Sequence, residues 1–377
     1  MDISEIFRKH ISEYLQQFGD RIPYNHIKTI NDILRCRTSD LGGNVFYCAE
    51  CDKYHYSYHS CKNRHCPKCG SQDSGKWLEK QKERFLPVLY FMVTFTLPQE
   101  LRSICRSNQK IFYSIMFKAS SSALRTLLND PKFAGGESGF TGILHTWTRQ
   151  LEYHVHTHYI VPGGAFDFDR NKWNISNHKF LIPVKALSKI FRKNFESMLK
   201  KKSMKLYSQI PQEIWKEKGF NTNSIQVGKG EEVFTYMANY IYKTGITNNR
   251  VLSCKDGEVT FQYKESKTDI IKYLKIPVTE FIRRFLQHVL PSGFQKVRYY
   301  GFLSSASKKK GKIVADYFDV KSDEYQKSES ASNQVKETFC RHCNTKMTLF
   351  ASIVRKPRAP PYKMYDSILE KTKQIND

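Results

Sequence analysis

The sequence predicts an α+β protein in which a central antiparallel sheet with flanking helices follows a helical, cysteine-rich N-terminal lobe. Residues 88–97, 142–147 and 154–161 have the length and the β-branched and aromatic content of strands, and we expect them at the centre of the sheet. Apolar residues at helical spacing over residues 1–35 and 99–130 predict amphipathic helices.

Composition indicates a polyanionic partner. The 377 residues include 61 Lys plus Arg against 36 Asp plus Glu, a formal charge of +25, together with 22 Tyr and 25 Phe that can stack on bases. We expect no membrane partner, because no stretch approaches the roughly 20 apolar residues of a spanning helix. The N-terminus lacks the layout of a secretion signal, so we expect a soluble, cytoplasmic, nucleic-acid-facing protein. In that compartment the ten cysteines are expected to be metal ligands rather than disulfides.

The chain is expected to have four parts. They are a helical segment (1–35), a cysteine-rich domain (36–80), a central domain with the sheet (85–305) and a basic, partly flexible C-terminal tail with a CxxC pair (306–377). From Ser307 the sequence turns to a lysine run and polar residues through Asn333, which predicts a flexible linker. Residues 183–205 predict a strongly basic helix with either a solvated or a DNA-tracking face.

Three histidines lie at alternate positions of one predicted strand. His154, His156 and His158 fall within a stretch that Pro162-Gly163-Gly164 ends, so all three side chains should project to the same face. A surface strand that happens to be rich in histidine would explain one of them. Three imidazoles at period two instead favour a site for a divalent metal.

The preceding strand offers a further ligand. A six-residue connection, 148–153, would close a hairpin in which Trp147 pairs with His154 and His145 pairs with His156. His145 would then lie on the ligand face within cross-strand reach. We therefore take His145 as the candidate third ligand, with His154 as the alternative.

The cysteine-rich domain carries two pairs of cysteines at metal-ligand spacing. Cys48-x-x-Cys51 and Cys66-x-x-Cys69 are separated by fourteen residues, a spacing that predicts one tetrahedral Zn²⁺ site. Two interpretations of the remaining cysteines and histidine are open, a second zinc site or ordinary thiols and a surface imidazole. These residues are Cys36, Cys61 and His65. The distant pair Cys340-x-x-Cys343 forms half a zinc site without an identified partner.

Basic side chains accompany the second cysteine pair. Lys62, Arg64 and Lys68 fall within the stretch Ser60–Cys69. A basic zinc ribbon of this kind is typical of a DNA-binding module, and a purely structural staple is the alternative.

Two tyrosines lie one helical turn apart near the middle of the chain. Residues 231–243 have the apolar spacing of an amphipathic helix, on which Tyr236 and Tyr240 are four residues apart and Lys243 lies just beyond. Tyrosine pairs on helices are usually residues at the edge of the core. The histidine strand upstream favours a functional role here.

Several of these stretches together resemble a known family. They are Cys36-Arg-Thr with Leu41-Gly-Gly43, Ser60–Cys69, His145-Thr-Trp147, His154–Gly164, Tyr236–Tyr240 with Gly245–Arg250, and Glu280–Phe285 running on to Arg298–Gly301. In this order, over about residues 30 to 303, the sequence resembles the rolling-circle transposases of bacterial insertion sequences. These form the IS91 group of the two-tyrosine HUH endonuclease superfamily.

The resemblance implies an HUH-type fold and a set of site residues. It implies that His156-Thr-His158 is the metal-binding histidine pair, that Tyr236 and Tyr240 are nucleophiles, and that Phe95-Thr-Leu97 is the first, strand-borne motif. Tyr240-x-x-Lys243 is similar to a motif of rolling-circle replication initiators, with Lys243 supporting phosphate or tyrosinate charge.

The chemistry that follows is nicking of single-stranded DNA through a 5′-phosphotyrosine at a Mg²⁺ or Mn²⁺ site, with zinc in a structural role. The expected partners are single strands at the ends of a mobile element and target DNA in the nucleoid. Imidazole ligands suit Mn²⁺ better than Mg²⁺. The alternatives are a replication initiator or relaxase of the same chemistry, and a non-catalytic zinc-dependent DNA-binding protein.

Overall fold

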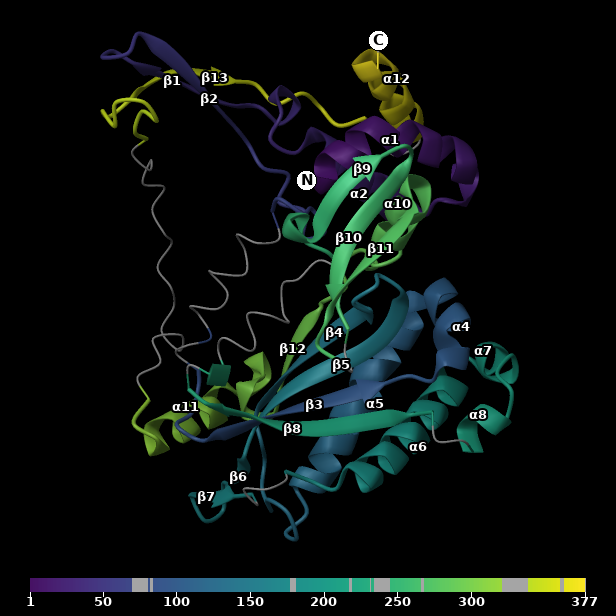
Figure 1. Cartoon of the computed structure of the whole chain (residues 1–377). Helices are drawn as coiled ribbons and strands as arrows, with labels where there is room; N and C mark the ends of the chain where they lie inside the picture. The colour runs from purple at the N-terminus through teal and green to yellow at the C-terminus, as the bar shows by residue number, and fades with distance from the viewer. Residues whose placement is uncertain are drawn as a thin grey trace. The chain divides into compact units, whose positions relative to one another are not determined.

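Figure 1 shows the computed structural model of the chain. The structure describes residues 1–69, 81, 84–176, 181–216, 219–230, 232–233, 245–265, 268–320, 338–359 and 363–376. The chain divides into two compact units. The first unit is formed by Met1–Asp73, Lys243–Val289 and Ser328–Asp377, and the second unit by Ser74–Tyr242 and Leu290–Lys327. In the part of the chain that the structure describes, no helix has the length and apolar content needed to cross a membrane.

The second unit is built on a five-stranded antiparallel sheet with the order β12-β4-β5-β3-β8. Its strands are β3 (Leu89–Thr96), β4 (Phe140–Trp147), β5 (Tyr153–Pro162), β8 (Asn221–Lys229) and β12 (Val297–Tyr300). The three predicted strands are the three central ones, so the predicted fold class and sheet centre are confirmed. The prediction does not include the two edge strands, β8 and β12, which complete the sheet from distant parts of the chain.

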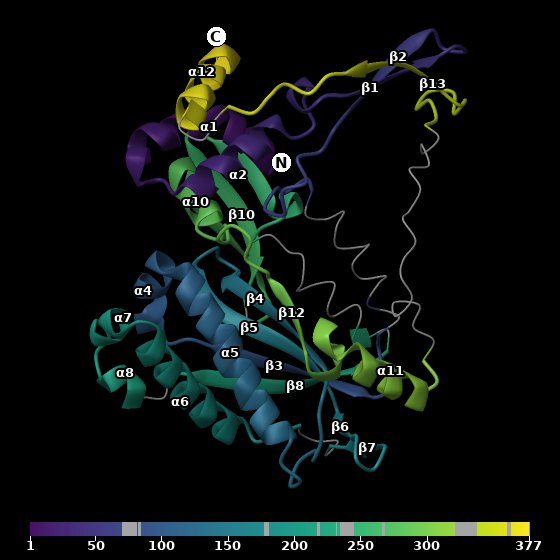
Figure 2. The ribbon, with the colours of Figure 1, turned by 180° about the vertical axis from the view of Figure 1, so that it is seen from behind.

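The two faces of this sheet have different surroundings. One face carries side chains such as Phe95 and Tyr159 and is covered by α5 (Gln109–Leu128) and α6 (Val184–Lys202), as Figure 2 shows from behind. The largest cluster of buried residues lies there. The opposite face carries a smaller apolar cluster with Met92, Ile143 and Ile160 at its centre. Because neighbouring residues of a strand point to opposite faces, the histidines of β4 and β5 lie on this second face.

Smaller elements surround the sheet of the second unit. The helices α4 (Arg102–Ser107), α7 (Met204–Ser208) and α8 (Glu213–Lys216) flank α5 and α6 in the sequence, and β6 (Gly164–Asp167) pairs with β7 (Lys172–Ile175). The predicted basic helix 183–205 corresponds to α6, whose buried residues recur every fourth position from Leu187 to Leu199. Its lysines therefore occupy the remaining, outer positions.

The structure describes residues 306–320, 338–359 and 363–376 of the predicted basic, partly flexible C-terminal tail. The lysine run at its start belongs to helix α11 (Lys308–Tyr317) of the second unit. This helix forms because Gly311, Val314 and Ala315 give it a buried side, on which Val314 joins an apolar cluster with Trp173. The prediction of a flexible linker relied on the lysine run and overlooked the apolar residues at helical spacing that follow it.

The first unit combines helices with a three-stranded sheet. Its helices are α1 (Ile3–Phe18), α2 (Tyr24–Arg35), α10 (Val278–Leu286) and α12 (Met364–Asn376), and its sheet has the order β11-β10-β9. The strands are β9 (Val251–Lys255), β10 (Glu258–Lys264) and β11 (Ile271–Pro277). The rings of Phe7 and Phe285 meet edge to face at 5.3 Å, and the Tyr365 hydroxyl donates to the Leu15 carbonyl, which ties α12 to α1. The C-terminal helix is thus packed against the N-terminal one.

A second, smaller sheet of the first unit joins the two ends of the sequence. Its central strand β1 (Gly43–Cys48) pairs with β2 (Lys53–Tyr58) on one side and with β13 (Thr348–Ile353) on the other. Figures 1 and 2 both show the yellow β13 beside the purple hairpin. The pairing brings a segment near residue 350 beside one near residue 45, which no local sequence pattern predicts.

Candidate metal centres

The histidine cluster lies on the second face of the central sheet. The register pairs His145 of β4 with His156 of β5, as predicted, and His158 follows His156 on the same face. One ring nitrogen from each of the three histidines lies within 4.8 Å of the others. The ring centroids of His158 are 4.8 Å from those of both His145 and His156. The arrangement converges three nitrogen donors on one point.

A bulge in β5, where His154 and Val155 lie opposite the single residue Thr146 of β4, changes the predicted register beyond His145. Trp147 pairs with Tyr153 and not with His154, so the predicted Trp147–His154 pair is wrong. Trp147 lies two residues after His145 on β4, and the two rings stack at 4.8 Å with an angle of 24° between their planes. His154 is not part of the cluster of three. Its Nδ1 lies 2.9 Å from Nη2 of Arg102 in α4.

Hydrogen bonds orient two rings of the cluster. His156 Nδ1 lies 3.0 Å from the backbone carbonyl oxygen of His154, so it carries the proton and donates there. Nδ1 of His158 lies 2.9 Å from the Thr94 hydroxyl, which can accept in the same way. An imidazole that is protonated on Nδ1 presents its lone pair on Nε2, the arrangement usual for a metal ligand.

Burial keeps these imidazoles in their neutral form. Desolvation lowers the pKa of His158 to about 4 and lowers the pKa of His156 well below its ordinary value, with the neighbouring histidines adding to the effect at His156. Burial and then the Arg102 charge lower the pKa of His154 to about 4. Neutral imidazole is the metal-binding form, so the donor set fits a divalent metal.

The chain leading to the predicted nucleophiles passes over the same face. Val233 is fully buried and belongs to the apolar cluster with Met92, Ile143 and Ile160, beside the histidines on the sheet. Tyr236, Tyr240 and Lys243 themselves lie outside the described residues. Tyr236 follows Val233 by three positions in the sequence.

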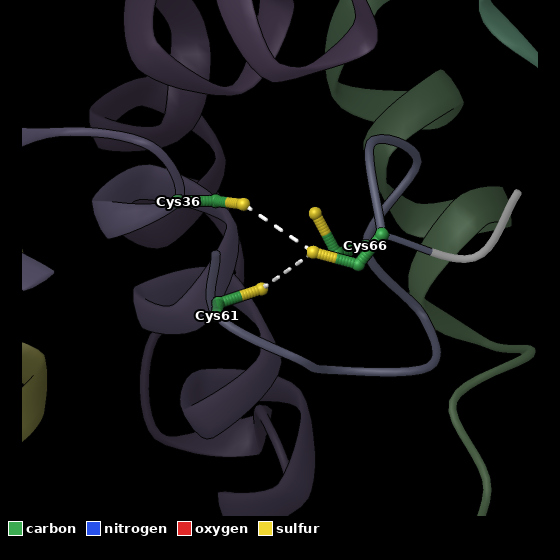
Figure 3. A group of neighbouring side chains, drawn as sticks. Cys36, Cys61 and Cys66 are labelled. Atoms are coloured by element: carbon green, nitrogen blue, oxygen red, sulfur yellow. Dashed lines mark hydrogen bonds between the residues drawn. The ribbon is translucent and has the colours of Figure 1, made fainter. Parts of the chain in front are cut away.

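The first cysteine cluster joins the C-terminal end of α2 to the segment that follows β2. It consists of Cys36, Cys61, Cys66 and Cys69, whose sulfur atoms lie within 4.8 Å of one another. Sγ of Cys69 is 3.5 Å from that of Cys36 and 3.6 Å from that of Cys61. Tetrahedral zinc with Zn–S bonds of about 2.3 Å separates its sulfurs by about 3.8 Å, so the geometry fits zinc. Figure 3 shows the labelled Cys36, Cys61 and Cys66 side chains converging.

The second cysteine cluster joins the β1–β2 turn to the C-terminal segment. It consists of Cys48, Cys51, Cys340 and Cys343. The sulfur–sulfur distances are 3.5 Å for Cys48 and Cys343 and 3.9 Å for Cys51 and Cys340. Hydrogen bonding from Thr345 lowers the pKa of Cys343 to about 6, which favours the thiolate that zinc requires. The half site at Cys340 therefore finds its partner in Cys48-x-x-Cys51.

This arrangement corrects the predicted zinc sites. The prediction joined Cys48 and Cys51 to Cys66 and Cys69, and considered Cys36, Cys61 and His65 for a second site. In the structure each CxxC pair belongs to a different cluster, and His65 belongs to neither. The reason is the β1–β2 hairpin. Cys48 and Cys51 lie at its closed end, whereas Cys36 and Cys61 flank its open end, and a six-residue strand spans roughly 20 Å.

Comparisons with known proteins match two long stretches of the chain. A family model described as "Transposase zinc-binding domain" matches residues 6–97, and one described as "Putative transposase" matches residues 139–310. The chain is 34% identical over 322 residues to "Putative transposase y4qJ" of Sinorhizobium fredii, covering 81% of this chain and 80% of that protein. The chain belongs to the IS91 family of transposases.

A second relative supports this assignment. The chain is 25% identical over 293 residues to "Transposase for insertion sequence element IS801" of Pseudomonas savastanoi pv. phaseolicola, covering 74% of this chain and 70% of that protein. No solved structure shows a significant match. The resemblance to the IS91 group is thereby confirmed. The zinc-binding model and the cysteine clusters also support structural zinc in this transposase. The model ends well before Cys340, so it contains only half of the second cluster.

The predicted DNA-contacting cations of the transposase lie beside the first cysteine cluster. Lys62 and Arg64 are exposed. Nζ of Lys68 lies 2.7 Å from a carboxylate oxygen of Asp2, the residue that caps α1. Lys68 thus already has a structural partner within the first unit. Of the predicted set, Lys62 and Arg64 are the more exposed side chains.

The second unit of the transposase also has a basic cavity away from the histidines. It has a volume of about 740 Å³ and lies between α5 and the segment around β12. Its lining includes Lys118, Arg125 and Arg298, several serines and no carboxylate. Lys118, Arg125 and Arg298 converge only when β12 joins the sheet, so the sequence analysis did not single out Lys118 or Arg125 and named Arg298 only within a stretch that resembles the family. Their charge favours an anion.

Thr94 and Arg102 are two further residues that the sequence analysis missed. Thr94 lies opposite His158 across the β3–β5 pair and contacts its ring, whereas Arg102 engages His154. A threonine in a strand and an arginine at the start of a helix carry no signal by themselves. Only the strand register identifies Thr94 as the neighbour of the histidine cluster.

Proposed function

We propose that this transposase nicks single-stranded DNA through a 5′-phosphotyrosine intermediate and transfers the strands in rolling-circle transposition. The observation that carries the proposal is the convergence of His145, His156 and His158 on one sheet face, whose apolar cluster includes Val233, three positions before Tyr236 in the sequence. Membership of a transposase family gives DNA as the substrate class. The basic cavity beside β12 and the formal charge of +25 suit a polyanion.

The proposed metal ligands are Nε2 of His156, Nε2 of His158 and a ring nitrogen of His145. Bound Mg²⁺ or Mn²⁺ would polarise the scissile phosphate and stabilise negative charge on the departing 3′ oxygen. Thr94 and the His154 carbonyl hold two of the rings, so the donors are positioned before metal and substrate arrive. Nitrogen ligands favour Mn²⁺ over Mg²⁺ on hard–soft grounds.

Tyr236 and Tyr240 are the proposed nucleophiles. The tyrosine hydroxyl loses its proton and attacks phosphorus, a P–O bond forms, and the bond from phosphorus to the 3′ oxygen breaks. The 3′ oxygen takes up a proton and leaves as a free hydroxyl. The phosphodiester is conserved as a phosphotyrosine, so religation by the reverse step needs no nucleotide cofactor. Lys243 is proposed to stabilise phosphate or tyrosinate charge.

Two nucleophiles serve strand transfer because one tyrosine remains occupied by a DNA end while the other attacks. This role predicts different results for nicking and for transposition. Tyr236→Phe and Tyr240→Phe should each retain some nicking of an oligonucleotide, the double variant should form no covalent adduct, and transposition should need both hydroxyls.

The decisive experiment is to incubate the purified protein and Mn²⁺ with single strands from both ends of the element that encodes it. A covalent protein–DNA adduct that survives denaturation is expected, and mass spectrometry of the tryptic peptide should place the phosphate on Tyr236 or Tyr240. An adduct on any other residue, or cleavage without an adduct, would overturn the proposal. Duplex of the same sequence serves as the control and should not be cleaved.

A further inference from the structure

One face of the small β13-β1-β2 sheet carries a row of exposed aromatic rings. Tyr54, Tyr56 and Tyr58 alternate along β2, so all three project to the same side. Their exposed fractions are 49%, 61% and 37%, and that of Phe350 on β13 is 63%. We define the aromatic face as Tyr47, Tyr54, Tyr56, Tyr58 and Phe350. Large rings with this degree of exposure, gathered on one surface, indicate an interaction site.

Contacts within the row show that it forms a continuous surface. Tyr54 pairs with Tyr47 across the strands, with 5.2 Å between ring centroids, and its ring meets that of Phe350 at 4.9 Å. The rings of Tyr56 and Tyr58 lie roughly parallel at 6.2 Å. The strands therefore hold the rings in fixed positions, with about 7 Å between alternate residues of one strand.

The opposite face of the same sheet is occupied by the second cysteine cluster. Phe46 and Cys48 form an apolar cluster there with Cys340 and Met347. Since Phe46 and Tyr47 are neighbours on β1, their side chains point to opposite faces. The metal site thus supports the sheet from one side and leaves the tyrosines on the other. A structural staple alone would not require tyrosines on the exposed side.

We propose that the aromatic face binds single-stranded DNA by stacking its rings on unpaired bases. This inference rests on the proposed function for the choice of single strands as substrate. Aromatic rings stack on any base, whereas the base faces of a duplex are already covered by their neighbours. Spacing along β2 lets successive tyrosines take successive bases of an extended strand.

Charge around the aromatic face also suits DNA. Residues 338–359 contain five cations, Arg341, Lys346, Arg355, Lys356 and Arg358, and no carboxylate. Lys356 and Arg358 form ion pairs with Asp40 and Asp32, while Arg355, two residues after the end of β13, is exposed. A second copy of this chain would bring the same positive charge to the interface, which disfavours it as the occupant.

The test uses the full-length, zinc-loaded chain and labelled oligodeoxythymidine, with binding followed by fluorescence anisotropy. Tyr54→Val, Tyr56→Val and Tyr58→Val combined keep β-branched residues in the strand but remove the rings. The affinity should fall at least about tenfold, since each lost stacking contact costs about fivefold or more. The matching triple substitution to Phe should stay within about twofold of the parent chain. Tyr273→Ala, which removes an exposed strand tyrosine elsewhere in the first unit, should change nothing.

An abasic strand of equal length separates stacking from phosphate contacts. The parent chain should bind it more weakly than oligodeoxythymidine, and the valine variant should bind both equally. The proposal is wrong if the valine variant, with its zinc content intact, binds oligodeoxythymidine like the parent. It is also wrong if that variant only converts a dimer to a monomer in sedimentation. These measurements need no cleavage, so an absence of covalent adducts with the parent chain would count against the proposed function and not against this face.

Discussion

The histidine cluster projects from a packed sheet, whereas the second cysteine cluster joins segments that have little apolar core of their own. His156 and His158 stand on β5, whose other face carries Tyr159 in the largest buried cluster of the protein. Around the second cysteine cluster, by contrast, every residue of β2 is exposed or half-buried. A metal at the histidines would therefore bind to a site that is already folded without it. Zinc at the cysteines, by contrast, contributes to the folding of the segment that binds it.

The largest effect is expected when a cysteine of the second cluster is removed. Cys340→Ser and Cys48→Ser should each cost the chain the same single zinc ion and unfold the β13-β1-β2 sheet. Structural zinc contributes on the order of 10 kcal/mol to small domains, more than the buried surface of such a sheet can replace. Elemental analysis of zinc per chain and hydrogen exchange of the β1 amides would measure both results.

The control for this prediction is Cys254→Ser, a cysteine that belongs to neither cluster. It should leave zinc and exchange unchanged. Full zinc content in Cys340→Ser, together with zinc loss in Cys48→Ser, would show that the C-terminal pair is not a ligand. The C-terminal segment would then be held to the β1–β2 hairpin by strand pairing and apolar packing alone.

The next largest effect concerns the histidines and should be confined to chemistry. His156→Ala and His158→Ala should each reduce nicking at least about a hundredfold, because charge on the departing oxygen loses its stabilisation. Binding of single-stranded DNA and the melting temperature should change little, since the sheet is held by its core. Adduct formation under Mn²⁺ titration, alongside anisotropy and thermal unfolding, would measure these outcomes. Undiminished cleavage by the double variant would remove the histidines from the mechanism.

The two kinds of site also differ in how far the sequence could predict them. The pairing of His145 with His156 follows from a short hairpin and the two-residue period of strands, and the structure has this pair. The bulge in β5 opposite Thr146 could not be foreseen, because one extra residue in a strand leaves no mark on the hydrophobic pattern. The strands at the sheet centre were predictable for the same reason as the histidine pair.

The cysteines show where local patterns fail. Spacing identified Cys48-x-x-Cys51 as half of a tetrahedral site, but its other half lies 295 residues away at Cys343. Four-ligand spacing favoured the nearer pair at Cys66, although the intervening hairpin keeps that pair apart from Cys48. Loop-closure entropy rises only slowly with length, so sequence distance is a poor guide to which thiols meet.

A moderate effect is expected from Thr94, which touches the cluster without being a donor to it. Thr94→Val removes the hydroxyl beside Nδ1 of His158 and conserves the volume of the side chain. Loss of such an orienting partner typically costs 10- to 100-fold in metal affinity or activity. Thr94→Ser should restore most of the loss. The apparent Mn²⁺ affinity, obtained from the metal dependence of nicking, is the measurement, and an unchanged value in Thr94→Val would show that the ring is held by packing alone.

The smallest effect is expected at His154, and it distinguishes the two candidates for the third ligand. Its side chain bonds to Arg102 outside the cluster, while its contribution to His156 comes from the backbone carbonyl, which substitution retains. His154→Ala should therefore leave nicking within about twofold of the parent and cost about 1 kcal/mol of stability, the value of one hydrogen bond. His145→Ala should instead match His156→Ala in nicking, because its ring nitrogen completes the group of three. If His154→Ala were inactive and His145→Ala active, the metal would be bound by the three alternate histidines of β5 alone, His154, His156 and His158. The cross-strand pair with β4 would then serve only to pack Trp147 against the edge of the sheet.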